Sequence, residues 1–130
     1  VILGSVDRFL GVLIEHFAGA FPVWISPVQV KIMNITDESA EYAEILYREL
    51  KQAGIRAEKD LRNEKIGYKI REAQMEKVPH MIVVGNNEMN ENKVSVRLRN
   101  GETKNNLDFS AYISVLKSLI DSKSLELWAE

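Results

Sequence analysis

The order of apolar and polar residues along the chain predicts strands and helices in alternation. Unbroken apolar or β-branched runs are typical of buried strands, and apolar residues that recur every three or four positions are typical of helices. Strands are predicted on this basis at residues 1–6, 28–35, 55–59 and 80–84. Helices are predicted at 7–18, 37–53, 65–77 and 109–119. The apolar stripe of the helix at 65–77 places Lys65, Lys69 and Glu72 on the opposite side, which we expect to face water.

The segment from 94 to 107 predicts a hairpin. Its first half, VSVRLR, alternates apolar and polar residues as a half-exposed strand does, and one face of this strand is basic. Asn100 and Gly101 form a favoured hairpin turn, so residues 102–107 should return as a partner strand. The whole order predicts an α/β fold with a mixed, largely parallel five-stranded sheet covered by three helices, preceded by the strand–helix unit at 1–18.

Composition and charge narrow the class of protein. The 130 residues are 45% apolar and 28% charged, which is ordinary for one soluble globular domain. No apolar run approaches the roughly 20 residues of a membrane-spanning helix, and the start lacks a signal-peptide pattern, so a cytoplasmic location is expected. The absence of cysteine excludes a disulfide framework and any thiolate site. A net charge of −2 argues against a non-specific nucleic-acid binder, although clustered cations permit a positive face.

Two segments carry a more specific signal. Residues 60–85 read DLRNEKIGYKIREAQMEKVPHMIVVG, and residues 4–19 read GSVDRFLGVLIEHFAG. The first resembles the anticodon-binding domain of bacterial-type threonyl-tRNA synthetases. The second resembles motif 3 of the class II catalytic domain in the same family, although Asp7 stands where family members more often carry glutamate. The resemblance implies three parts: a motif 3 strand–helix remnant of the catalytic domain at 1–22, a connector at 23–27, and an anticodon-binding domain at 28–130.

Three side chains are candidates for reading bases. Asn63 lies just before a helix, where it could cap the helix, pair with the edge of a base, or do both. Arg97 could form a surface ion pair or bridge two acceptors on guanine, and Glu88 could be an ordinary solvated acid. The resemblance implies that Asn63, Glu88 and Arg97 select the guanine and uracil in the second and third anticodon positions. It also implies that Arg8 approaches ATP phosphate in the parent enzyme.

Five other cations are candidates for phosphate contacts: Lys65, Lys69, Arg71, Lys93 and Arg99. For Lys65 and Lys69, a solvated helix face is an equally good explanation. His16 and His80 lack the spacing of metal ligands, so we interpret both as structural and expect no metal site.

The resemblance implies a function for the chain as part of a longer parent. The parent would join threonine to tRNA using ATP, with ATP, magnesium and zinc held by its catalytic domain, through which it would form a homodimer. This chain would bind the anticodon stem-loop of threonine tRNA without a cofactor, and on its own we do not expect it to be catalytic. The alternatives are the anticodon domain of the proline, histidine or glycine synthetase, or a non-catalytic synthetase-like interaction domain.

Overall fold

A computed structural model of the chain describes residues 20–128. The predicted strand and helix at 1–18, with Arg8 and His16, lie outside the described residues. Two 3-10 turns, η1 (Val23–Ile25) and η2 (Asp37–Ser39), accompany the main elements. The strands are β1 (Val30–Asn34), β2 (Ala57–Asp60), β3 (His80–Val84), β4 (Lys93–Leu98) and β5 (Thr103–Asp108). The helices are α2 (Ala40–Gln52), α3 (Ile66–Met75), α4 (Asn86–Glu91) and α5 (Phe109–Asp121).

The five strands form one sheet in the order β2-β1-β3-β4-β5. β1 pairs in parallel with β2 and β3, whereas β4 is antiparallel to both of its neighbours. Four strands therefore run in one direction and β4 opposes them. This confirms the predicted mixed, largely parallel sheet.

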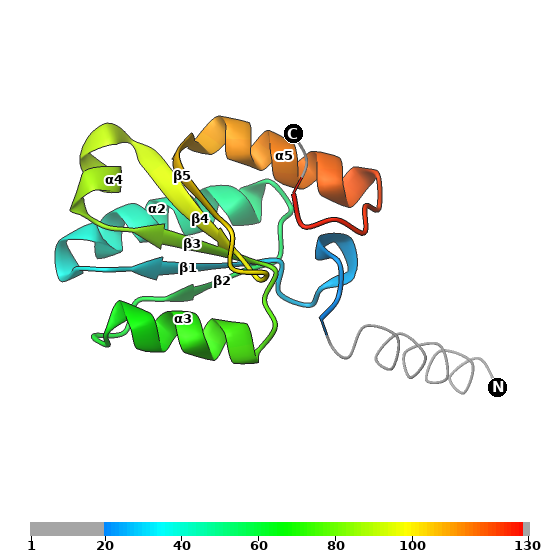
Figure 1. Cartoon of the computed structure of the whole chain (residues 1–130). Helices are drawn as coiled ribbons and strands as arrows, with labels where there is room; N and C mark the ends of the chain where they lie inside the picture. Colours follow the sequence, from blue (N-terminus) through cyan, green and yellow to red (C-terminus); the bar gives the residue numbers. More distant parts are fainter. Residues whose placement is uncertain (1–19, 129–130) are drawn as a thin grey trace.

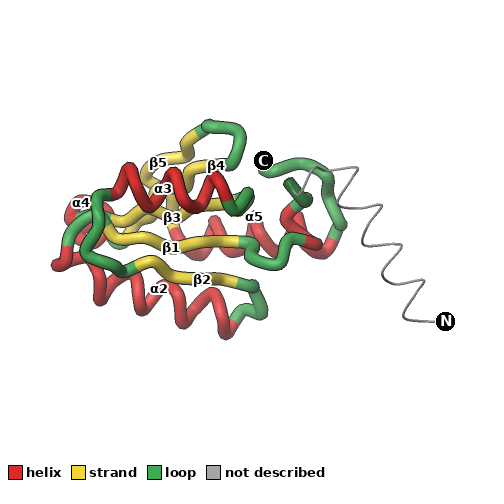
Figure 2. The backbone as a smooth tube through the Cα atoms, turned by 90° about the horizontal axis from the view of Figure 1, so that it is seen from below, coloured by secondary structure: helices red, strands yellow, loops and turns green. Residues whose placement is uncertain are grey.

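Helices cover the two faces of the sheet unequally. α2 and α5 lie on one side and α3 on the other (Figure 1). The larger apolar core lies between the sheet and α2 with α5, and it includes Ile32, Leu50 and Leu116. The smaller core joins α3 to β1 and β3 through Ala73, Met33 and Met81. Figure 2 views the molecule from the α3 side, and β5 is visible there beside that helix.

Turn chemistry sets two of the predicted boundaries. Gly54 ends α2 with a φ of 81°, and Gly101 makes the hairpin turn with a φ of 97°. Both angles lie in the left-handed region that glycine adopts without a steric penalty. The predicted helix stop and hairpin are therefore confirmed.

The short helix α4 lies in the segment GNNEMNENK, between the predicted strand at 80–84 and the predicted hairpin, where no helix was predicted. Glu88 caps it, because the Glu88 Oε2 atom accepts the Gly85 N–H at 3.0 Å. Asn92, with a φ of 56°, ends it in the left-handed conformation. The asparagines in this segment have low helix propensity, so sequence periodicity does not reveal a helix that depends on its cap.

Candidate nucleic-acid interface

The half of the α3-side face formed by β4 and β5 carries polar side chains. Along β4 the residues alternate, with Val94, Val96 and Leu98 at most 1% exposed in the larger core. Ser95 and Arg97 lie opposite Val83 and Met81 of β3, so their side chains share the face that α3 partly covers. The predicted half-exposed strand with one basic face is confirmed.

A cavity of about 240 Å³ lies on this face, beside α3. Its lining residues are Ile70, Val83, Glu88, Ser95, Val96, Arg97, Thr103 and Asn105. The structure therefore brings together two of the predicted base-reading residues, Glu88 and Arg97. Apolar side chains from α3 and the sheet and polar groups from α4, β4 and β5 meet here, a combination typical of ligand sites.

The carboxylate of Glu88 is held in a fixed position. Its Oε1 atom accepts the hydroxyl of Ser95 at 3.0 Å, and its Oε2 atom accepts the backbone N–H of Gly85 at 3.0 Å. Each carboxylate oxygen has more than one acceptor position, so Glu88 retains capacity for a ligand donor. The sequence did not reveal the role of Ser95, because the contact depends on how α4 is placed against β4.

Arg97 carries a buried donor with no partner in the described part of the chain. Its Nε atom is inaccessible and makes no hydrogen bond there. A buried N–H without an acceptor costs about 1–3 kcal/mol, so such a group calls for an explanation. Arg97 lines the cavity, so a change in its side-chain conformation would bring this donor to an acceptor on a ligand, and the Glu88 carboxylate would accept from the donors of the same ligand.

Asn63 lies apart from this cavity. It is exposed in the loop between β2 and α3, and it is not among the residues that line the cavity. The capping interpretation is wrong, because the N-cap of α3 is Lys65 and no side chain caps that helix. No hydrogen bond within residues 20–128 engages the Asn63 side chain, so its amide is free to contact a ligand.

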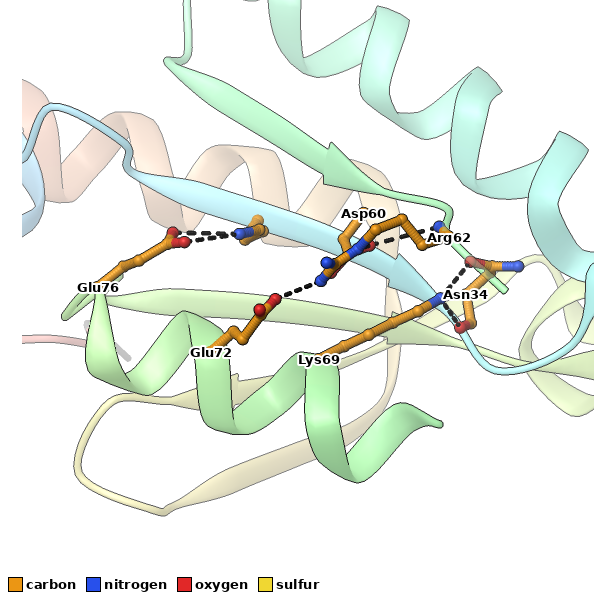
Figure 3. A network of polar contacts seen from close by, with 7 residues as sticks. Asn34, Asp60, Arg62, Lys69, Glu72 and Glu76 are labelled. Atoms are coloured by element: carbon orange, nitrogen blue, oxygen red, sulfur yellow. Dashed lines mark hydrogen bonds and ion pairs between the residues drawn. The ribbon is translucent and has the colours of Figure 1, made fainter. Parts of the chain in front are cut away.

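The loop that carries Asn63 is fixed by its neighbour Arg62 (Figure 3). The Arg62 guanidinium donates to both oxygens of Asp60, at 2.9 and 2.8 Å, and also to Glu72 of α3. These contacts lower the pKa of Asp60 and of Glu72, so both carboxylates remain charged. Asp60 is 5% exposed, which makes this pair the internal anchor of the loop.

The expectation that Lys69 faces water is wrong. Lys69 is 1% exposed, and its ammonium donates to the backbone oxygen of Asn34 at 3.1 Å and to the Asn34 Oδ1 atom at 2.9 Å (Figure 3). Burial lowers the pKa of Lys69. The side chain of Lys69 fastens α3 to the end of β1 and is not available for phosphate.

The other four candidate phosphate contacts differ in accessibility. Lys65 and Arg71 are exposed, and Lys93 is half-buried at the start of β4. Arg99 donates to the backbone oxygens of Phe21 and Lys77, at 2.9 and 3.2 Å, so it serves mainly to join segments of the fold. Lys65, Arg71 and Lys93 therefore remain the accessible candidates.

His80 lies in the core, in keeping with a structural role. Its Nε2 atom is 2.6 Å from the backbone oxygen of Leu127, and its Nδ1 atom is 2.8 Å from the Tyr112 hydroxyl. The carbonyl can only accept, so Nε2 carries the proton and Nδ1 accepts from Tyr112. In the part of the chain that the structure describes, no three acidic, histidine or cysteine side chains gather as metal ligands would.

Comparison with known proteins identifies the family. A family model described as an anticodon binding domain matches residues 24–119. This chain belongs to the anticodon-binding domain family. The chain is 53% identical, over 123 residues, to the threonine–tRNA ligase of Clostridium acetobutylicum, and 54% identical over 123 residues to that of Clostridium kluyveri. Each alignment covers 95% of the chain and 19% of the relative.

Solved structures agree with this assignment. The RNA-binding domain of threonyl-tRNA synthetase from Cryptosporidium parvum superposes on this chain with a TM-score of 0.81 at 33% identity, covering 87% of this chain and 28% of that one. Prolyl-tRNA synthetase from the same organism gives a TM-score of 0.69 at 28% identity, covering 78% and 22%. The resemblance to the threonyl-tRNA synthetase anticodon domain is therefore confirmed over the proline alternative.

Two further facts concern the extent of the match and the helices. The chain spans about a fifth of the length of the curated relatives it matches. Among residues 20–128, none of the helices has the length and apolar character needed to cross a membrane.

Proposed function

We propose that this domain recognises the anticodon of threonine tRNA, with the middle base bound in the cavity between Glu88 and Arg97. The observation that carries the proposal is a cavity lined by both the fixed Glu88 carboxylate and Arg97, whose buried Nε–H has no partner within residues 20–128. An arginine fork pairs well with the two acceptors of guanine, and a carboxylate accepts from base donors. Glu88 and Arg97 together therefore complement both kinds of group on a guanine edge.

The other proposed RNA contacts are assigned to candidate side chains that are accessible to a ligand. Asn63, exposed on an anchored loop, would bind the third anticodon base, for which its amide offers both donors and an acceptor. Lys65, Arg71 and Lys93 would contact phosphates and supply a salt-dependent, sequence-independent part of the affinity.

The wider activity belongs to a longer protein in this proposal. The high identity to threonine–tRNA ligases supports a parent that attaches threonine to its tRNA in the cytoplasm. The parent's catalytic part would hold ATP, magnesium and zinc and form the homodimer. Residues 1–22, with Arg8, would belong to that part, and 23–27 would connect it to the anticodon-binding domain.

Binding of an anticodon stem-loop tests the base-reading role of Arg97. Arg97→Ala should weaken binding to the stem-loop of threonine tRNA by about 1–3 kcal/mol and abolish the preference for the natural middle base. Affinities would be measured for the natural stem-loop and for one with that base replaced. Arg48→Ala is the matched control, because Arg48 lies on α2 with its side chain 70% exposed, on the opposite side of the sheet.

Each outcome has a defined meaning. If the wild-type domain binds both stem-loops equally, anticodon recognition is wrong. If Arg97→Ala weakens both by the same factor, Arg97 contacts phosphate and does not read the base. An absence of binding to any tRNA favours an interaction domain for proteins.

A further inference from the structure

A second cavity adjoins the one that contains Arg97. It has a volume of about 530 Å³ and is lined by Asn87, Glu88, Glu91, Ser95, Asn105 and Asn106. Glu88, Ser95 and Asn105 line both cavities, so a ligand in one would neighbour a ligand in the other. The first cavity reaches α3 through Ile70, whereas the second is built from α4, β4 and β5.

A β-bulge places two consecutive asparagines in this cavity. In the pairing of β4 with β5, Val94 lies opposite Leu107 and Val96 opposite Lys104. One residue separates the partners on β4 and two separate them on β5, so β5 contains one extra residue. Asn106 takes the left-handed conformation, with a φ of 57°. Asn105 and Asn106 are therefore both exposed at the cavity, where a regular strand would turn one of them toward the core.

The chemistry of the lining favours a nucleobase over a phosphate. Two of the six lining residues are acids and none is a cation, which disfavours an anion. Each asparagine amide offers two donors and an acceptor, the same kinds of group that a base edge presents. No hydrogen bond within the described residues engages the amides of Asn87, Asn105 and Asn106, in contrast to Asn34, whose amide donates to the Thr36 oxygen at 2.7 Å.

We propose that the asparagine cavity binds the base of the first anticodon nucleotide. This inference rests on the proposed function, in which the middle base occupies the adjoining cavity and Asn63 contacts the third. The second cavity lies on the side of the first that is away from α3, so it is placed for the remaining neighbour of the middle nucleotide. Amides can orient toward several edges, so the site contributes affinity for a base without strict selection of its identity.

A stem-loop that lacks the first anticodon base tests the inference. The wild-type domain should bind this abasic RNA about tenfold more weakly than the intact one, as expected for the loss of one or two hydrogen bonds. A double variant, Asn87→Ala with Asn106→Gly, should bind both RNAs with similar affinity, and neither residue lines the first cavity. Glycine at 106 retains the left-handed backbone while removing the amide. Asn92→Gly is the matched control, because Asn92 has a similar φ of 56° and does not line the cavity.

A second abasic RNA, lacking the middle base, separates this inference from the proposed function. Loss of the middle base should weaken binding by a similar factor, relative to the intact RNA, in the wild type and in the double variant. If removal of the middle base has no effect on the wild type, the proposed function fails. If that removal matters but removal of the first base has the same effect on the wild type and on the double variant, the asparagine cavity is not a base site. A uniform loss of affinity for all three RNAs in the double variant would also overturn it.

Discussion

Acidification should destabilise the domain through His80. Burial lowers the pKa of this imidazole to about 4, from an ordinary value of 6.5. The unfolded chain therefore binds a proton between these two pH values while the folded domain does not, so the free energy of unfolding falls as the pH is lowered through this window. The gap between the two pKa values corresponds to about 3 kcal/mol, at roughly 1.4 kcal/mol per pKa unit.

The hydrogen bonds around His80 explain why its protonation is costly. The neutral ring donates from Nε2 to the Leu127 oxygen and accepts at Nδ1 from Tyr112, which is 1% exposed. A protonated ring would donate at both positions, and the buried Tyr112 hydroxyl proton would lose its acceptor. The nearby charge of Arg99 also opposes protonation.

Urea unfolding of the wild type and of His80→Gln, at pH values from about 7.5 to 4, provides the test. The variant should be less stable at neutral pH but should lose about 3 kcal/mol less on acidification. Comparing the two profiles cancels the contributions of His16 and of the carboxylates. Parallel profiles would show that His80 titrates normally in the folded domain and would refute the argument.

Two further predictions concern stability at neutral pH and use urea unfolding. Gly54→Ala should cost about 1–2 kcal/mol, because alanine is strained at a φ of 81°, although no atom lies within 4 Å of the new methyl group. Gly67→Ala, at an equally open site within α3, is its control and should stabilise by about 0.5–1 kcal/mol; equal losses at the two glycines would show that backbone strain at Gly54 is not the cause. Lys69→Met should cost about 1–3 kcal/mol, since Asn34, itself 2% exposed, would lose the donor to two oxygens. Unchanged stability of Lys69→Met would show that relief of the buried charge compensates for those bonds.

Hydrophobic spacing was sufficient to predict most of the fold. The run at 80–84 matched β3, and glycines marked the end of α2 and the hairpin turn, because these features are set by local burial and backbone conformation. Lys69 was misplaced because its long side chain lies between α3 and β1, and helical periodicity does not reveal a buried polar partner on another element. Lys104 lies in the same hairpin as Arg97 but on the other face of the sheet, over the Trp128 ring, so the two cations do not form one positive surface.

The candidate site was less accessible to sequence reasoning. Family resemblance named Glu88 and Arg97, and the structure places them in one cavity. Neither the Ser95 contact nor the bulge at Asn106 could be predicted, because each depends on the pairing of segments that only the folded sheet brings together. Asn63 was named from the same resemblance, yet it lies in the loop before α3, whereas the cavity residues lie on helices and strands.

On β4, beside the part of the sheet that α3 leaves open, neighbouring residues have two different roles: some stabilise the fold and others face the cavity. Val94, Val96 and Leu98 pack in the larger core, while the side chains of Ser95 and Arg97, between them, lie on the face of the sheet that carries the cavity. Ser95 and Arg97 are half-buried and belong to neither apolar core, so substitutions there change the cavity and leave the packing of the core residues in place. The ligand preference of this scaffold can therefore be altered by evolution or by design, one alternate position at a time, while the residues that determine folding stay the same.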